Sequence, residues 1–233
     1  MPKLDDNIQY LKGVGPALAK KFAKLGVHTV RDLLFHYPRR YVDYTRPYAV
    51  AEAPYDVDCC VRAEVLQKEP PRRIKGGRVL TRVLAADDSG TLALSWFNAP
   101  YVAEHLEIGQ SYYFEGRVGG SLTRREILHP AIRTRADVAA APLVPVYPST
   151  EGLPSGRIAR AAAAALDAAD DLPDPLPAFL LTKYRMPSRA AAIRAIHAPK
   201  SAEDAAAARR RLIFEELYVL QLGIMLSLCD SAA

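Results

Sequence analysis

Alternating apolar and polar residues between positions 57 and 135 constrain the fold of this chain more than any other feature. The alternation has a period of two, which places successive side chains on opposite faces of a β-strand. The predicted strands are residues 57–65, 78–86, 92–97, 112–118 and 122–129. This stretch therefore predicts a small β domain.

The order of the predicted elements indicates which β fold they form. Asp87–Gly90 is a turn between the second and third strands, and Gly119-Gly120 is a predicted hairpin turn before the fifth. A short helical segment, 100–106, separates the third strand from the fourth. Three strands, a short helix and two strands is the order of an OB-fold, a five-stranded barrel used for oligonucleotides. SH3-like and other small β-barrels remain alternatives.

Two aromatic residues are predicted at the rim of this barrel. Leu92, Leu94 and Trp96 form the expected core face of the third strand, so Phe97 points to the other face. Tyr101 follows the strand break within a few residues. Aromatic rings on a β-barrel beside basic residues stack on unpaired bases. The alternative is that Phe97 caps the core edge and Tyr101 packs under a loop.

Basic residues gather around two predicted hairpins. The chain is mildly basic, with a net charge of +5 and a pI near 9.1, which permits a nucleic-acid partner without requiring one. We expect the two hairpins to flank the rings and to contact a DNA backbone, although charged hairpin tips are also common solubility devices. The candidate backbone contacts are Arg72, Arg73, Lys75, Arg78, Arg117, Arg124 and Arg125.

Residues 8–37 are predicted to form short helices around a Gly-Val-Gly-Pro turn. Pro16 suits the first turn of a helix, and Thr29 is a plausible N-cap for the next one. The turn resembles a helix-hairpin-helix, in which backbone amides bind phosphate without reading sequence. Gly13, Gly15 and Lys20 are therefore candidate phosphate contacts; the alternative is a tight turn in a helical cap.

The region after the barrel is predicted to be mostly helical. The predicted domains are residues 1–48, a helical segment with a connector; 49–142, the barrel; and 143–233, a helical region. The fold class is thus mixed α and β, an OB-fold barrel flanked by helices. The last helix, 203–228, is apolar on almost every side, so we expect it to be buried against a partner or a missing continuation. His197, at a helix end, is expected to be structural.

Catalytic and metal-binding motifs are not found in the sequence. It contains no Gly-Lys-Ser or Gly-Lys-Thr of a P-loop, no Gly-x-Ser-x-Gly and no His-Glu-x-x-His. Its three cysteines lack zinc-ligand spacing, so we expect no metal, no disulfide framework and a cytoplasmic location. No uninterrupted apolar run has the roughly 20 residues needed to cross a bilayer. We predict no active site, and hence no catalytic residues, in this chain.

Four stretches of the chain are similar to one family in sequence. They are LKGVGPALAKKFAKLGVHTVRDLLFHYPRRY at 11–41, LALSWFN at 92–98, VPVYPSTEGL at 144–153 and RRLIFEELYVLQLGIML at 210–226. In these stretches the chain resembles the N-terminal part of the RecG family of DNA helicases, which remodel stalled replication forks. Residues 229–233 do not resemble the family's continuation, which favours a truncated end.

The resemblance implies a role in binding branched DNA. In that family this region is the wedge, an OB-fold with flanking helices that binds the branch point of forks and Holliday junctions. Phe97 and Tyr101 resemble the wedge aromatics that stack on bases where the duplex splits. Motor domains would follow in cis and would bind ATP and Mg, so no cofactor is expected in this chain, which is expected to be a monomer.

Two other functions remain open from the sequence. The chain can be a protein-interaction or structural module whose last helix docks on another protein. It can also be a general single-strand DNA-binding OB-fold, for which oligonucleotide length matters and branching does not.

Overall fold

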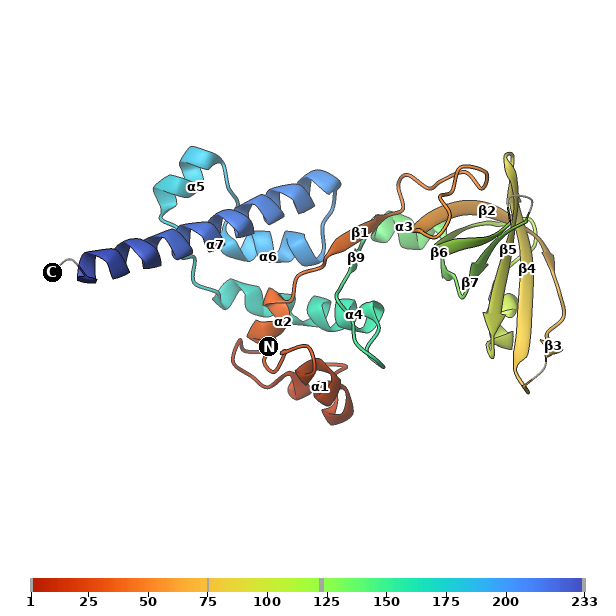
Figure 1. Cartoon of the computed structure of the whole chain (residues 1–233), viewed down its shortest axis with the longest axis horizontal. Helices are drawn as coiled ribbons and strands as arrows, with labels where there is room; N and C mark the ends of the chain where they lie inside the picture. Colours follow the sequence, from red (N-terminus) through yellow and green to blue (C-terminus); the bar gives the residue numbers. More distant parts are fainter. Residues whose placement is uncertain (1, 75, 122–123, 232–233) are drawn as a thin grey trace. The chain divides into compact units, whose positions relative to one another are not determined.

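The computed structural model describes residues 2–74, 76–121 and 124–231, which form two compact units (Figure 1). One unit is residues 42–142; the other combines residues 1–41 with 143–233. The sequence predicts three consecutive segments, with boundaries at 48/49 and 142/143. By contacts, the two helical ends instead belong to one unit, because their apolar residues share one core.

The unit of residues 42–142 contains a closed five-stranded barrel. Its strands are β2 (Asp58–Lys68), β4 (Val79–Asp87), β5 (Gly90–Phe97), β6 (Ser111–Ser121) and β7 (Arg124–Leu128). They pair in the order β2-β4-β5-β7-β6, and β6 pairs back with β2; β5 and β7 are parallel and the other neighbours antiparallel. The short helix η2 (Pro100–His105) lies between β5 and β6. The OB-fold prediction is confirmed.

Short elements complete this unit. Strand β3 (Arg72–Arg73) pairs with β4, and β8 (Ala131–Arg133) pairs with β6. Helix α3 (Arg135–Ala140) follows β8. A separate two-stranded sheet lies outside this unit: β9 (Leu143–Val146) pairs with β1 (Arg40–Asp43), which spans the boundary at residues 41 and 42.

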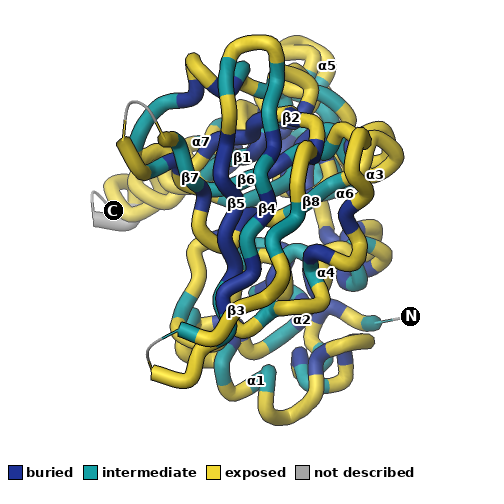
Figure 2. The backbone as a smooth tube through the Cα atoms, turned by 90° about the vertical axis from the view of Figure 1, so that its right-hand side faces the viewer, coloured by how far each residue is buried: buried dark blue, intermediate teal, exposed yellow. Residues whose placement is uncertain are grey.

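Strand β5 is buried along most of its length, as Figure 2 shows. Leu92, Leu94 and Trp96 lie in the barrel core as predicted, and the Trp96 ring N–H donates to the carbonyl of Pro130 at 3.2 Å. Ala93 and Ser95 on the opposite face are buried too. The Ser95 hydroxyl donates to the Glu126 carboxylate on β7 at 2.6 Å, which satisfies this buried polar group.

The predicted hairpin turn at Gly119-Gly120 is wrong. Both glycines lie inside β6, opposite Glu126 and Arg125, and the strand continues to Ser121. Gly120 has a φ of +94°, and a Cβ there would lie 2.2 Å from the Arg124 carbonyl oxygen. These glycines therefore permit a close approach of two backbones rather than a turn. The predicted fifth strand is described from Arg124 onward.

The second unit is helical and is built from both ends of the chain. Its elements are η1 (Ile8–Tyr10), α1 (Pro16–Ala23), α2 (Val30–Phe35), α4 (Ser155–Ala165), η3 (Leu166–Asp171), α5 (Ala178–Tyr184), α6 (Arg189–His197) and α7 (Ala202–Ser231). Thr29 caps α2 as predicted, and Asp32 completes a capping box with it. Phe22 and Leu33 from one end pack in the same core as Ile158 and Ile193 from the other.

His197 ties the two ends of this unit together. Its Nδ1 is 2.7 Å from the Tyr147 hydroxyl, and its Nε2 is 2.9 Å from the carbonyl oxygen of Leu34. The ring is buried, and its tautomer follows from a backbone carbonyl being able only to accept: Nε2 donates and Nδ1 accepts. The histidine is a structural residue here, as expected.

Within this chain only the first half of the last helix is buried, and its covering by a partner or a missing continuation stays a prediction. Ala208 and Leu212 of α7 are buried, but Leu217, Leu220 and Leu226 are each 60–65% exposed. Judged by length and composition alone, residues 202–229 also form one helix that could span a bilayer. One such helix is weak evidence for a span, because helices of soluble proteins pass the same test.

Candidate nucleic-acid interface

Phe97 ends strand β5 and lies between two other side chains. The Arg78 guanidinium is 5.2 Å from the centre of the Phe97 ring, within cation–π range, and the His129 ring centre is 5.6 Å away at 48°. Phe97 is half-buried. The ring is therefore held in place at the end of the strand rather than packed in the core.

Asn98 sets the direction of the chain after Phe97. It has a φ of +57°, and its side-chain oxygen accepts from the Val79 amide at 3.1 Å while its own amide donates to the Val79 carbonyl at 2.7 Å. These bonds end β5 and lead into η2, which begins at Pro100. Tyr101 on η2 is 58% exposed, so the structure presents this ring to solvent, as the sequence predicts.

Lys68 fixes η2 against the barrel. Its ammonium donates to the carbonyls of Ala103 at 3.1 Å and Leu106 at 2.8 Å. In the structure its charge is occupied in holding the helix that carries Tyr101.

Strand register places the first basic arm beside Phe97. Arg72 on β3 lies opposite Leu80 on β4, and Leu80 lies opposite Phe97 on β5. Neighbouring strands are about 4.8 Å apart, so Arg72 and Phe97 are about 10 Å apart across the sheet. Arg72, Arg73 and Arg78 are all exposed on this arm. Lys75 lies outside the described residues.

The second basic hairpin lies at the other end of β5, which corrects the expectation that both hairpins flank the rings. Arg125 on β7 lies opposite Leu92, five residues before Phe97, which is about 16 Å along a strand. Arg124 is exposed there. Arg117 is exposed and pairs weakly with Asp58 at 3.8 Å.

Arg125 is occupied within the barrel. Its two terminal nitrogens donate to the carbonyls of Ala53 and Ala51, and its guanidinium lies 4.6 Å from the centre of the Tyr55 ring. These contacts fasten the segment before β2 to strand β7. The side chain is therefore better explained as structural than as a backbone contact for DNA.

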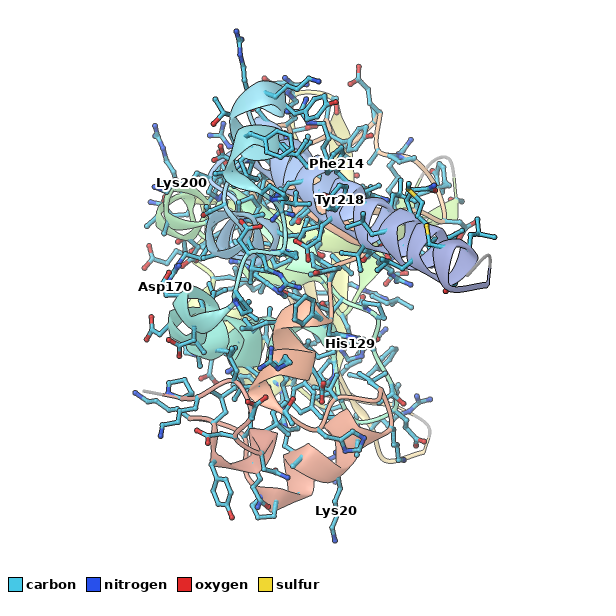
Figure 3. The ribbon with its side chains drawn as sticks, turned by 90° about the vertical axis from the view of Figure 1, so that its left-hand side faces the viewer. Lys20, His129, Asp170, Lys200, Phe214 and Tyr218 are labelled. Carbon is cyan, nitrogen blue, oxygen red and sulfur yellow. The ribbon has the colours of Figure 1, made fainter. Side chains whose placement is uncertain are left out.

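The turn before α1 brings together only part of its predicted set. Gly13 has a φ of +86°, and Gly15 is the N-cap of α1. Lys20 lies in the last turn of α1, away from the helix start, and Figure 3 shows its side chain pointing away from the helical body. Gly13 and Gly15 thus share the turn, whereas Lys20 does not contribute to it.

His129 is a site residue that the sequence analysis missed. It follows β7 with a φ of +51°, its amide donates to the Ser95 carbonyl at 2.7 Å, and its Nε2 lies 3.4 Å from the Phe97 amide. The OB-fold order could have indicated this residue. In that order the fifth strand, β7, pairs in parallel with the third, β5, so the residue after β7 lies near the end of β5.

The described residues contain no group of three or more His, Cys, Asp or Glu side chains placed to hold a metal ion. Cys59 and Cys60 are buried in β2. Burial raises the pKa of the Cys60 thiol to about 12, so this thiol stays protonated at neutral pH.

The sequence family follows from a direct match over most of the chain. The model of the RecG wedge domain matches residues 7–166. The chain belongs to the RecG wedge family. The chain is 31% identical over 228 residues to ATP-dependent DNA helicase RecG of Streptococcus pneumoniae, covering 96% of the chain and 33% of that protein.

Other relatives of this RecG wedge give the same coverage. The Escherichia coli K12 ATP-dependent DNA helicase RecG is 32% identical over 233 residues, covering 92% of the chain and 32% of that protein. The solved structure of RecG bound to a three-way DNA junction is 26% identical, with a TM-score of 0.79 over 96% of this chain and 31% of that one. The chain thus spans about a third of the length of these relatives.

Proposed function

We propose that this RecG wedge binds branched DNA and that Phe97 and Tyr101 stack on bases where the duplex splits. The observation that carries the proposal is the position of Phe97 at the end of β5, beside the basic arm of Arg72, Arg73 and Arg78, with the exposed ring of Tyr101 four residues later on η2. A relative has been solved bound to a three-way DNA junction, which supports this choice of ligand.

The mechanism is static support of an opened base pair. Stacking on an aromatic ring is worth about 1–3 kcal/mol per base, and opening one step of the duplex costs about 1.4 kcal/mol. Two rings therefore offset the opening of roughly one base pair. Directional movement needs a separate source of work.

Arginines on the barrel surface hold the separated backbones in this proposal. Arg72, Arg73 and Arg78 contact the strand next to Phe97, and Arg124 contacts backbone about 16 Å or more further along the barrel. Arg117 contacts backbone from β6, which β7 separates from β5. Arg125 is left out because carbonyl groups already occupy it.

The motor belongs to the remaining part of a longer protein in this proposal. The relatives are named as ATP-dependent DNA helicases and are about three times as long as this chain. The chain contains no P-loop, so ATP and Mg would bind the motor domains in cis. The exposed second half of α7 would then dock on those domains.

Fluorescence anisotropy with a labelled fork, linear duplex and single strand at fixed salt tests the DNA-binding proposal. We expect the fork to bind most tightly. The Phe97→Ala, Tyr101→Ala double variant should lose that preference and keep weak duplex binding, since the phosphate contacts remain. Phe179→Ala is a matched control, because this ring is 66% exposed on the helical unit.

Each alternative function predicts a different result in the same assay. Equal affinity for fork and duplex contradicts the proposal. Affinity that depends on oligonucleotide length and not on branching identifies a general single-strand binder. Loss of fork preference in the Phe179→Ala control would show that the effect is not specific to the barrel rim.

A further inference from the structure

A hollow on the helical unit has a basic lining that the barrel does not explain. It has a volume of about 280 Å³ and lies between the turn before α1 and the first turns of α4. Its lining residues are Lys12, Gly13, Leu18, Arg157, Arg160 and Ala161. Residues 12 and 157 are far apart in sequence, so only the fold brings these cations together.

Positive charge in this hollow is not neutralised by the protein. None of its lining residues carries a carboxylate. Within the described part of the chain, Lys12 and Arg157 have no hydrogen bond or ion pair through their side chains, and Arg160 has only a long bond of 3.4 Å from Nε to the Gly156 carbonyl. Lys12 also borders a neighbouring hollow that is lined by the carboxylates of Asp6 and Asp167. Of these two hollows, Arg157 and Arg160 line only the basic one.

The helix ends add to this positive charge. Neither α1 nor α4 has an acidic residue in its first turn. Arg157 instead stands in the first turn of α4, where the helix dipole disfavours a cation. Arg160 follows three residues later, and residues three apart with like charge repel each other. Stability alone favours the opposite arrangement, so a bound anion explains these charges better than folding does.

The turn before α1 supplies hydrogen-bond donors at the same place. Gly13 lines the hollow, and its amide donates to no acceptor among the residues that the structure describes. A Cβ at Gly13 or Gly15 would meet nothing within 4 Å, so the backbone here is open to a ligand. Backbone amides at a helix start are suited to phosphate oxygens.

We propose that this hollow binds the phosphate backbone of a duplex DNA arm through Lys12, Arg157, Arg160 and the Gly13 turn. The inference rests on the proposed function and adds a second DNA contact, on the helical unit. No aromatic ring lines the hollow, so it offers phosphate contacts without base stacking. That combination fits a duplex backbone better than a single strand, whose binding uses stacking.

The test measures the salt dependence of DNA binding by the full chain. The Lys12→Gln, Arg157→Gln, Arg160→Gln triple variant is titrated with fork and linear duplex by anisotropy between 50 and 200 mM salt. We expect weaker binding to both DNAs by the same factor, and a slope of log affinity against log salt that is smaller by about 2 to 3. The ratio of fork to duplex affinity should not change.

Two control variants separate this site from general charge and from misfolding. Lys20→Gln, Lys24→Gln, Lys183→Gln removes three exposed charges elsewhere on the same unit and should leave the slope nearly unchanged. Lys12→Arg, Arg157→Lys, Arg160→Lys keeps the charges and should bind as the wild type does. Thermal unfolding by circular dichroism shows that each variant is folded.

Three results would overturn the proposal. One is a salt-dependence slope that is unchanged in the triple glutamine variant. Another is an equal loss of DNA affinity in the variant that replaces Lys20, Lys24 and Lys183. The third combines two observations. If the Gly13 amide resonance shifts when inorganic phosphate is added, but the triple glutamine variant keeps the DNA affinity of the wild type, the hollow is a site for free anions only. A failure of the stacking proposal gives a different result. In that case the Phe97→Ala, Tyr101→Ala double variant keeps its preference for the fork over the duplex.

Discussion

Phe97 and Tyr101 differ in how firmly neighbouring side chains hold each ring before DNA binds. The Arg78 guanidinium and the His129 ring hold Phe97, whereas Tyr101 is largely exposed. A ring that is already ordered loses less side-chain entropy on binding. Under the proposed function, a base takes the place of Arg78 on the ring face, and the arginine is then free to contact a phosphate.

At the same scale, His197 couples stability of the helical unit to pH. Burial lowers the pKa of His197 from 6.5 to about 4. The unfolded state therefore binds this proton at a higher pH than the folded state does. Stability from the neutral ring is complete above pH 6.5 and is lost as pH falls toward 4, by up to about 3 kcal/mol.

Thermal unfolding of wild type and His197→Gln between pH 7 and 4 checks this prediction. The variant loses hydrogen bonds and should be less stable at pH 7, but its melting temperature should fall less steeply below pH 6.5. Carboxylates titrate in both proteins, so the difference between the two curves isolates the histidine. Parallel curves would contradict the assignment.

At the scale of elements, a buried ion network joins α7 to α6 and the loop before α5. Arg211 is fully buried and contacts Glu215 and Asp174, each at 2.6 Å, and its Nε donates to the Pro187 carbonyl at 3.1 Å. Arg189 on α6 adds a second cation at 2.8 Å from Glu215. The network fixes the first half of α7 in one register against α6.

Arg211→Met should destabilise the helical unit strongly. The substitution leaves the Glu215 and Asp174 carboxylates short of a buried partner, and breaking such a pair costs about 3–5 kcal/mol. Arg210→Met is the matched control, because Arg210 is exposed on the neighbouring helix position and should cost less than about 0.5 kcal/mol. Denaturant unfolding measures both; similar losses would show that Arg211 has no special role.

At the scale of the whole molecule, the described residues of this chain leave the second half of α7 exposed. Leu217, Leu220 and Leu226 are exposed, and they lie in the stretch 210–226, one of the four that are similar to the RecG family in sequence. The chain spans only about a third of its relatives. Under the proposed function, this exposed apolar half of α7 docks on the motor domains.

Replacing Leu217, Leu220 and Leu226 together by Gln should leave the stability of the isolated chain almost unchanged, because these side chains bury little surface within it. The substitution should also reduce any self-association seen by sedimentation velocity at micromolar concentration. A large fall in the unfolding midpoint would show instead that the leucines pack on this chain.

The strands, the aromatic pair and the Thr29 cap were predictable from the sequence. Each depends on residues a few positions apart: alternation in β5, the break at Asn98, and Asp32 three residues after Thr29. Gly119-Gly120 was misread because the same residue pair serves a tight turn or a close backbone approach, and only the partner strand distinguishes them.

By itself, then, the sequence determined the OB order, the family and the position of Phe97 at the end of β5, because local periodicity and short motifs carry that information. Only the tertiary structure decided that the second basic hairpin lies away from Phe97, that Arg125 is occupied, and that the helical ends share a core. The physical reason is sequence separation: the His197–Leu34 bond joins residues 163 apart, and no local pattern encodes such a contact.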